Sequence, residues 1–291
     1  MENAAMDSNG LRLFRAVAQS GSVAAAADSV HSVPSNISAR IRKLEDELGA
    51  QLFVREPRGM RLTAAGEVLA DYAERILALG AEAKAAVAEV VGGGGALRLA
   101  SMESTAAVRL PPILAGFAAG HPRIGLSLTT GTSESVLQAV LERRADLGFA
   151  GGPVRHDRIV GEAVFTEELV LAVPHSVTSV EQANTRAMLV FRSGCAYRAR
   201  TENWLRRRGE PPRTIMEFGT LDGLLGCIAA SMGVSLLPRI VVERPHLAGQ
   251  ISALTIADSR VETWVIRHRD CVPSRAMNAF MDCLRSPAQA A

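Results

Sequence analysis

Apolar residues recur every three or four positions along most of the first 91 residues, and this spacing predicts a series of helices. In the first helix, Leu11, Phe14 and Val17 share one face. A second, rich in alanine, is predicted over residues 23–30, and a third over residues 34–48. Three short helices in succession, with tight turns between them, are typical of a helix-turn-helix unit.

The helix predicted over residues 34–48 has two chemically different faces. Its apolar face consists of Ile37, Ile41, Leu44 and Leu48, which indicates packing against the other helices. Its opposite face carries small, polar and basic side chains, which a helix entering the major groove of DNA requires. A solvated surface face is the alternative, but such a face usually carries more Glu and Lys in its first half.

Two short apolar segments follow, at residues 52–55 and 61–63, around a turn that contains Pro and Gly. They predict a hairpin wing whose arginines reach a phosphate backbone or a narrow minor groove. A purely structural hairpin is the alternative. The predicted DNA-contacting residues are Ser22, Ser35, Asn36, Ser38, Arg40, Arg42, Lys43, Arg55, Arg58 and Arg61.

Residues 63–91 show apolar positions at alternating spacings of three and four, the pattern of a heptad seam. We expect one long helix whose seam, formed by Leu69, Tyr72, Ile76 and Leu79, packs against a second copy of the chain. Packing of this seam on the chain's own second half is the alternative. It is disfavoured because 29 helical residues extend about 43 Å, which is long for a compact domain.

Four consecutive glycines at 92–95 then separate the helical part from a part in which strands and helices alternate, as in α/β domains. Strands are predicted at 97–102, 124–130, 146–149, 169–173, 188–191, 214–218, 234–237 and 263–268, and helices at 106–119, 133–144, 198–208, 221–232 and 276–284.

Composition and motifs exclude several classes of function. The chain has 291 residues, enough for two domains, and its net charge of +2 is too small to indicate nucleic-acid binding by itself. The four cysteines and six histidines show no metal-binding spacing, and no hydrolase, P-loop or dinucleotide-binding motif occurs. We therefore expect neither an enzyme nor a bound cofactor or metal.

The same sequence predicts where the protein works. It opens without a basic and then apolar leader, and no apolar run reaches about 18 residues, so we expect a cytoplasmic protein with no membrane partner. An exported solute-binding protein is the alternative, but it would explain only the second half of the chain and would need an export signal.

One set of short motifs resembles the LysR-type transcriptional regulators. They are Leu13-Phe14, Val17-Ala18, Gly21-Ser22, Ala26-Ala27, Ser38, Ile41-Arg42-Lys43-Leu44-Glu45, Leu48-Gly49, Leu52-Phe53-Val54-Arg55 and Leu62-Thr63-Ala64-Ala65-Gly66. The resemblance is dense over residues 11–80, and its overall plan covers the chain. Many family members have Gln-Pro near the start of the recognition helix, whereas this chain has Pro34-Ser35.

The resemblance implies an α/β protein with an N-terminal winged helix-turn-helix, a long linker helix and a two-subdomain effector domain like periplasmic binding proteins. The implied domains are 1–62 for DNA binding, 63–95 for the linker helix and glycine hinge, and 96–291 for the effector domain. Within the last, subdomain I comprises 96–164 and 267–291, and subdomain II comprises 165–266. The implied partners are an operator in double-stranded DNA, one or three further copies of the chain, and RNA polymerase.

In open α/β units, ligands bind beyond the carboxyl ends of strands, near helix N-termini that favour anions. The residues at such positions are Ser101, Glu103, Ser104, Thr105, Gly151, Ser193, Cys195 and Thr220. We expect them to hold a small anionic or zwitterionic effector that modulates DNA binding or promoter activation. Redox sensing through Cys195, which precedes Arg198 and Arg200, is the alternative.

Overall fold

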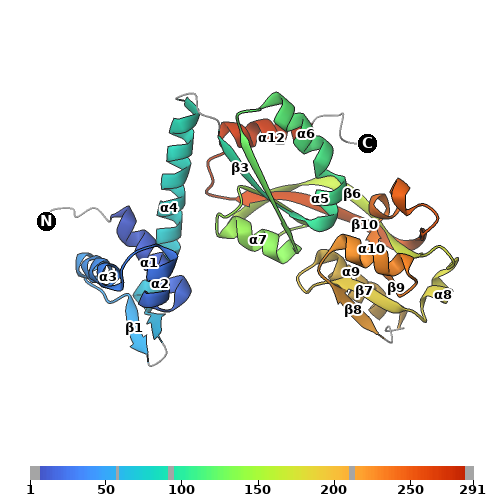
Figure 1. Cartoon of the computed structure of the whole chain (residues 1–291), viewed down its shortest axis with the longest axis horizontal. Helices are drawn as coiled ribbons and strands as arrows, with labels where there is room; N and C mark the ends of the chain where they lie inside the picture. Colours follow the sequence, from blue (N-terminus) through green and yellow to red (C-terminus); the bar gives the residue numbers. More distant parts are fainter. Residues whose placement is uncertain (1–6, 57–58, 91–94, 210–213, 286–291) are drawn as a thin grey trace. The chain divides into compact units, whose positions relative to one another are not determined.

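The computed structural model describes residues 7–56, 59–90, 95–209 and 214–285. For residues 82, 85, 86 and 88–90 it describes the backbone alone. The chain divides into two compact units, with the boundary after Val87 (Figure 1). None of the described helices is long and apolar enough to cross a membrane.

The N-terminal unit is a three-helix cluster followed by a hairpin and a long helix. Its elements are α1 (Ser8–Ser20), α2 (Val23–Ser29), α3 (Pro34–Leu48), β1 (Phe53–Glu56), β2 (Gly59–Leu62) and α4 (Ala64–Val90). Leu11, Phe14 and Val17 are buried in its core, as predicted, together with Ile37 and the rest of the apolar face of α3 up to Leu44.

Leu48 is the exception on that face, because it is 41% exposed rather than buried. It is the last residue of α3, and Gly49 then takes the left-handed conformation (φ +64°) that ends the helix. The apolar face predicted from the spacing is therefore one turn longer than the part of α3 that is buried in the core.

The turns of the N-terminal unit hold the hairpin against the helices. Gly21 caps α1 in the left-handed conformation, and its carbonyl accepts a hydrogen bond from the N–H of Met60 at 2.7 Å. A Cβ on Gly59 would lie 2.4 Å from the same carbonyl, and Gly59 has φ +143°. Gly21 is favoured by its left-handed backbone, and Gly59 is needed because β2 passes directly over the α1–α2 turn.

The C-terminal unit is built on one mixed sheet of eight strands in the order β4-β3-β5-β10-β6-β9-β7-β8. Its strands are β3 (Ala96–Met102), β4 (Gly125–Gly131), β5 (Leu147–Gly151), β6 (Ile159–Pro174), β7 (Ala187–Phe191), β8 (Ile215–Phe218), β9 (Gly233–Pro238) and β10 (Ile251–His268). Its α-helices are α5 (Glu103–Val108), α6 (Leu110–Gly120), α7 (Ser133–Leu141), α8 (Val180–Ala183), α9 (Ala196–Arg208), α10 (Leu221–Ala229), α11 (Arg239–Val242) and α12 (Arg275–Arg285).

The long antiparallel strands β6 and β10 pass from one half of this sheet to the other (Figure 1). Sequence reasoning predicts only the apolar run 169–173 of β6, because the first half of that strand carries exposed residues. The end of β10, Thr263 to Ile266, pairs with β5 of the first half. The return crossover therefore lies before residue 263, earlier than the predicted boundary at 267.

The single helix predicted over 106–119 is wrong. The chain instead forms α5 and α6, which meet at Arg109. Pro111 and Pro112 explain the break, because a proline lacks the N–H that a helix interior needs and its ring clashes with the preceding turn. Both prolines occupy the first turn of α6, where they are tolerated.

Helices cover both faces of the first half of the sheet. The aromatic rings of Phe117 on α6 and Phe280 on α12 lie 5.4 Å apart, and that of Phe149 on β5 lies 6.3 Å from Phe280. Val136 and Val140 of α7 pack on the opposite face. In the second half, α10 and α11 share one apolar cluster, and α8 and α9 contribute to another. The strand ends are thereby held rigidly beside the loops that form the site.

Candidate DNA-binding face and effector cavity

The outer face of α3 is polar and accessible. Ser35, Asn36, Arg42 and Lys43 are exposed, and Ser38 is half-buried. The amide of Asn36 donates to the Ser32 hydroxyl at 3.0 Å, and the Arg42 guanidinium donates to the Ser38 carbonyl at 3.3 Å. These contacts orient the side chains along the helix while leaving donors that could reach base edges.

Two of the predicted cations on α3 are also engaged within the unit. Arg40, half-buried, pairs with Asp7 at 3.3 Å, and Lys43 lies 3.7 Å from Glu47 on the next turn. Exposed pairs of this kind contribute little to stability, so they remain exchangeable for phosphate.

The arginines of the hairpin differ in their contacts within the protein. Arg55 is exposed, whereas Arg61 donates to Glu56 at 2.6 Å, and this hydrogen bond raises the pKa of the Arg61 guanidinium. Arg58 lies outside the described residues. Ser22 acts as the N-cap of α2, accepting from the N–H of Ala25 at 3.5 Å.

Sequence reasoning missed two residues of this unit. Val33, the N-cap residue of α3, is apolar yet 59% exposed beside the polar face. Glu45, near the end of α3, accepts hydrogen bonds from the N–H groups of Leu52 and Phe53 at 2.8 and 3.4 Å. It therefore joins α3 to the hairpin. The sequence offered one signal for Val33, which is its place in the turn directly before Pro34, the first residue of the helix.

An apolar strip runs along α4, but its membership differs from the predicted seam. Tyr72, Ile76 and Leu79 are exposed, as is Val68, which the prediction omitted. Leu69 is only 7% exposed and belongs to the core of its own unit. It lies seven residues before Ile76 and therefore on nearly the same side of α4, and it is buried because the three-helix cluster packs against the first turns of this helix.

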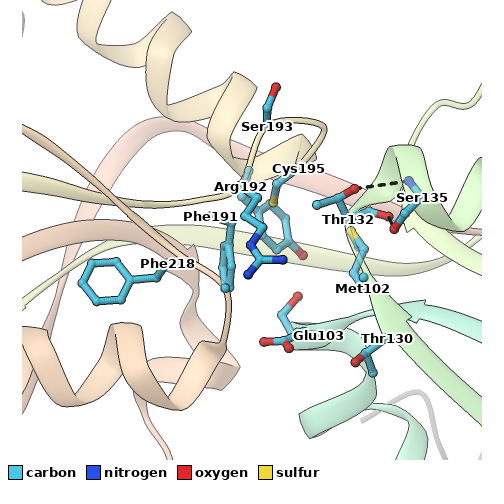
Figure 2. A pocket seen from close by; sticks show the side chains of 14 residues that line it. Met102, Glu103, Thr130, Thr132, Ser135, Phe191, Arg192, Ser193, Cys195 and Phe218 are labelled. Carbon is cyan, nitrogen blue, oxygen red and sulfur yellow. Dashed lines mark hydrogen bonds between the residues drawn. The ribbon is translucent and has the colours of Figure 1, made fainter.

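The C-terminal unit contains a cavity of about 440 Å³ at the carboxyl ends of its strands. It is lined by Met102, Glu103, Ser104, Thr130, Gly131, Thr132, Ser135, Phe191, Arg192, Ser193, Cys195, Tyr197, Phe218 and Gly219. Figure 2 shows these side chains arriving from several elements, with Thr130 and Thr132 at the β4–α7 junction facing Arg192 and Cys195 on the opposite wall.

Four of the eight residues predicted for the effector line this cavity: Glu103, Ser104, Ser193 and Cys195. The other four do not line it, because they are buried or form hydrogen bonds within the fold. Ser101 is fully buried and donates to the Met102 carbonyl, and Thr105 is also buried. Thr220 caps α10 by accepting from the Gly223 N–H, and the N–H of Gly151 donates to Ser133.

Sequence reasoning missed Arg192, Tyr197 and the residues at the end of β4. Arg192 directly follows β7, so the rule that ligands lie beyond strand ends could have found it. The Gly219 position shows how closely it packs, because a Cβ there would lie 2.7 Å from a guanidinium nitrogen of Arg192.

Glu103 links the two halves of the C-terminal unit. It is the first residue of α5, and its carboxylate Oε2 accepts a hydrogen bond from the N–H of Leu221 at 2.6 Å. Leu221 begins α10, whose N-terminal end favours a negative charge. A carboxylate of the first half therefore holds the end of a helix in the second half.

A buried group of hydroxyls lies behind the cavity. Burial raises the pKa of Tyr197 to about 12, because a phenolate would lose its hydration there. In the described part of the chain, the oxygens of Ser104 and Thr263 are buried without a hydrogen-bond partner. Buried hydroxyls normally find partners, so these two have bonding capacity to offer.

Cys195 lies on the cavity wall as the N-cap residue of α9 and is buried. Burial raises the pKa of its thiol, although the backbone N–H groups of Arg198 and Tyr197 and the charge of Arg198 act against this effect. The four cysteines are free thiols. Within the described ranges, no cluster of three or more His, Cys, Asp or Glu side chains is placed to hold a metal ion.

Known protein families match both units. The family described as "Bacterial regulatory helix-turn-helix protein, lysR family" matches residues 8–67, and that described as "LysR substrate binding domain" matches residues 92–289. Among curated proteins, the HTH-type transcriptional regulator GltR of Bacillus subtilis is 39% identical over 284 residues, covering 96% of each chain. YusT of the same organism, also described as an HTH-type transcriptional regulator, is 41% identical and covers 95% of each.

Solved structures share the fold. The LysR family regulator CbnR aligns with a TM-score of 0.67 at 24% identity, covering 98% of this chain and 99% of that one. A full-length OxyR variant from Pseudomonas aeruginosa aligns with a TM-score of 0.71 at 19% identity, covering 99% and 97%. The matches to both units and to full-length regulators agree: this chain belongs to the LysR-type family of transcriptional regulators.

Proposed function

We propose that this regulator reads its operator with the outer face of α3 and responds to a small organic effector bound in the cavity of the C-terminal unit. The observation that supports effector binding most strongly is the cavity of about 440 Å³ itself, which combines a guanidinium, several hydroxyls and three aromatic rings at the strand ends. A ligand there contacts both halves of the sheet. It can shift DNA binding only if it prefers one arrangement of the protein over another.

A solved neighbour supports the class of function. The regulatory domain of CcmR from Synechocystis, 20% identical with a TM-score of 0.60 and covering 65% of this chain and 95% of that one, was solved in complex with 2-PG. A small ligand bound to that domain is consistent with a small-molecule effector here.

The exposed strip on α4 supports self-association. Val68, Tyr72, Ile76, Leu79 and Val87 are large apolar residues exposed at spacings of three, four or eight along one side of the helix. Apolar stripes of this kind on long helices usually mark a protein interface. The strip fits a second copy of the chain, giving a homodimer that can pair further into a tetramer.

The proposed operator contact is tested by Arg42→Ala. Full-length wild type and variant are titrated at fixed salt against an operator selected from a random DNA pool and against scrambled DNA. Loss of a bidentate guanine contact should weaken operator binding by about 1–3 kcal/mol and scrambled DNA much less. Arg55→Ala, which removes an exposed wing cation, should weaken both DNAs more evenly. Unchanged operator affinity in Arg42→Ala would rule out base reading by Arg42.

Redox sensing by Cys195 is a second candidate, because backbone N–H groups of Tyr197 and Arg198 act on its sulfur and favour a thiolate. The effect of burial on the pKa outweighs them, so at neutral pH the thiol stays protonated and should react slowly. We expect iodoacetamide at about pH 7.5 to label Cys195 more slowly in the native protein than in urea. If micromolar peroxide alters operator binding by wild type but not by Cys195→Ser, the redox function replaces the effector function.

A further inference from the structure

The cavity contains one cationic and one anionic side chain that are not paired with each other. Arg192 and Glu103 both line it, and both lie against the same short loop. The guanidinium of Arg192 packs on Gly219, and the carboxylate of Glu103 is bonded to the N–H of Leu221, two residues further along. Figure 2 shows the Arg192 side chain extending into the cavity on the side where Glu103 lies.

Each of these charges has capacity for a ligand. Among the described residues, the guanidinium of Arg192 forms no ion pair or hydrogen bond, and this side chain is exposed and lines the cavity. Glu103 uses Oε2 to accept from Leu221, while Oε1 has no hydrogen-bond partner in the same part of the structure. The buried hydroxyl of Ser104, also without a partner, lines the same cavity.

Charge complementarity then selects the class of effector. A carboxylate held by Arg192 without a cation beside it would face the negative charge of Glu103, and an amine held by Glu103 alone would face the guanidinium. A molecule that carries both an ammonium and a carboxylate satisfies both groups. Met102, Phe191 and Phe218 leave an apolar region of the cavity for the remainder of the molecule.

We infer that the effector is a zwitterion, a free amino acid, with its carboxylate on Arg192 and its ammonium on Oε1 of Glu103. This inference rests on the proposed effector function of the cavity. Such a ligand would also be linked to the second half of the sheet, because the Glu103 carboxylate that binds its ammonium accepts a hydrogen bond from the N-terminus of α10.

The test uses full-length protein in a thermal-shift screen, followed by calorimetric titration of each compound that raises Tm. The compounds are the common L-amino acids, 4-aminobutyrate and 5-aminovalerate, together with plain carboxylates and plain amines of the same carbon skeletons. We expect at least one amino acid to bind. Its N-acetyl and its amide derivative should each bind about tenfold or more weakly, since each lacks one of the two charges.

Two variants assign the charges. Glu103→Gln keeps an oxygen for the Leu221 N–H but loses the negative charge, so it should bind the amino acid at least about tenfold more weakly and bind the N-acetyl derivative better than wild type does. Arg192→Gln should show the reverse preference, favouring the amide derivative. Glu142→Gln and Arg207→Gln, which remove exposed charges outside the cavity, should behave as wild type.

The outcomes separate this inference from the function on which it rests. If plain carboxylates bind more tightly than any amino acid, and Arg192→Gln but not Glu103→Gln abolishes that binding, the zwitterion inference is overturned and the effector cavity stands. If no compound of the three classes binds, both are contradicted.

Discussion

A chain that carries both Ile76→Glu and Leu79→Glu is expected to sediment as a monomer and to lose operator binding, while the wild type sediments as a dimer or tetramer. Both residues lie on the exposed apolar strip of α4. In an interface between two copies, each added carboxylate is buried without a partner, which costs several kcal/mol, about two to four for each. Sedimentation velocity at micromolar concentration measures the change.

Lys84→Glu provides the matched control, because it places an acidic side chain on the same helix at an exposed polar position that is not one of the strip residues. It should leave the assembly intact. A double variant that sediments and binds a two-half-site operator as the wild type does would show that the strip is not the interface.

Glu167→Ala is expected to destabilise the C-terminal unit by about 3–5 kcal/mol, because it leaves a mostly buried guanidinium without its counter-ion. Glu167 lies on β6, is 5% exposed, and accepts from Arg109 at 2.9 Å. The Arg109 guanidinium also lies 5.4 Å from the ring centre of Phe165, so it cannot simply turn into solvent without losing that contact.

Urea unfolding followed by tryptophan fluorescence measures this effect cleanly, because the two tryptophans, Trp204 and Trp264, are both in the C-terminal unit. Glu162→Ala is the control on the same strand: it removes an exposed ion pair with Arg285 and should cost less than about 1 kcal/mol. Equal unfolding midpoints for Glu167→Ala and Glu162→Ala would show that the buried pair contributes nothing beyond an exposed one.

Sequence reasoning succeeds where local patterns decide the structure. The apolar arc from Ile37 to Leu44 and the glycine at the end of α3 determine that helix without reference to distant residues. The long helix α4 follows from its spacing in the same way. Which of its apolar positions remain exposed does not, since Leu69 is buried only because the three-helix cluster packs against the first turns of α4.

The site is harder to predict because it is assembled from distant segments. Strand-end positions locate Glu103, Ser104, Ser193 and Cys195, but the same rule also selects Ser101, which is fully buried and does not line the cavity. The bond between Glu103 and the start of α10 spans 118 residues and has no local signature. Such contacts follow from the crossover of β6 and β10, which the sequence patterns mark only in part.

We propose that this chain binds a specific operator as a symmetric assembly and that an amino acid controls this binding. DNase I footprinting of full-length protein on DNA selected from a random pool tests it most directly, with and without the amino acid that gives the largest rise in Tm. We predict protection of two inverted half-sites about one or two helical turns apart, and a change in the extent or spacing of protection when the amino acid is added. Protection without sequence preference would show that the chain does not read a specific operator, and a footprint that no bound amino acid alters would show that amino acids do not control it.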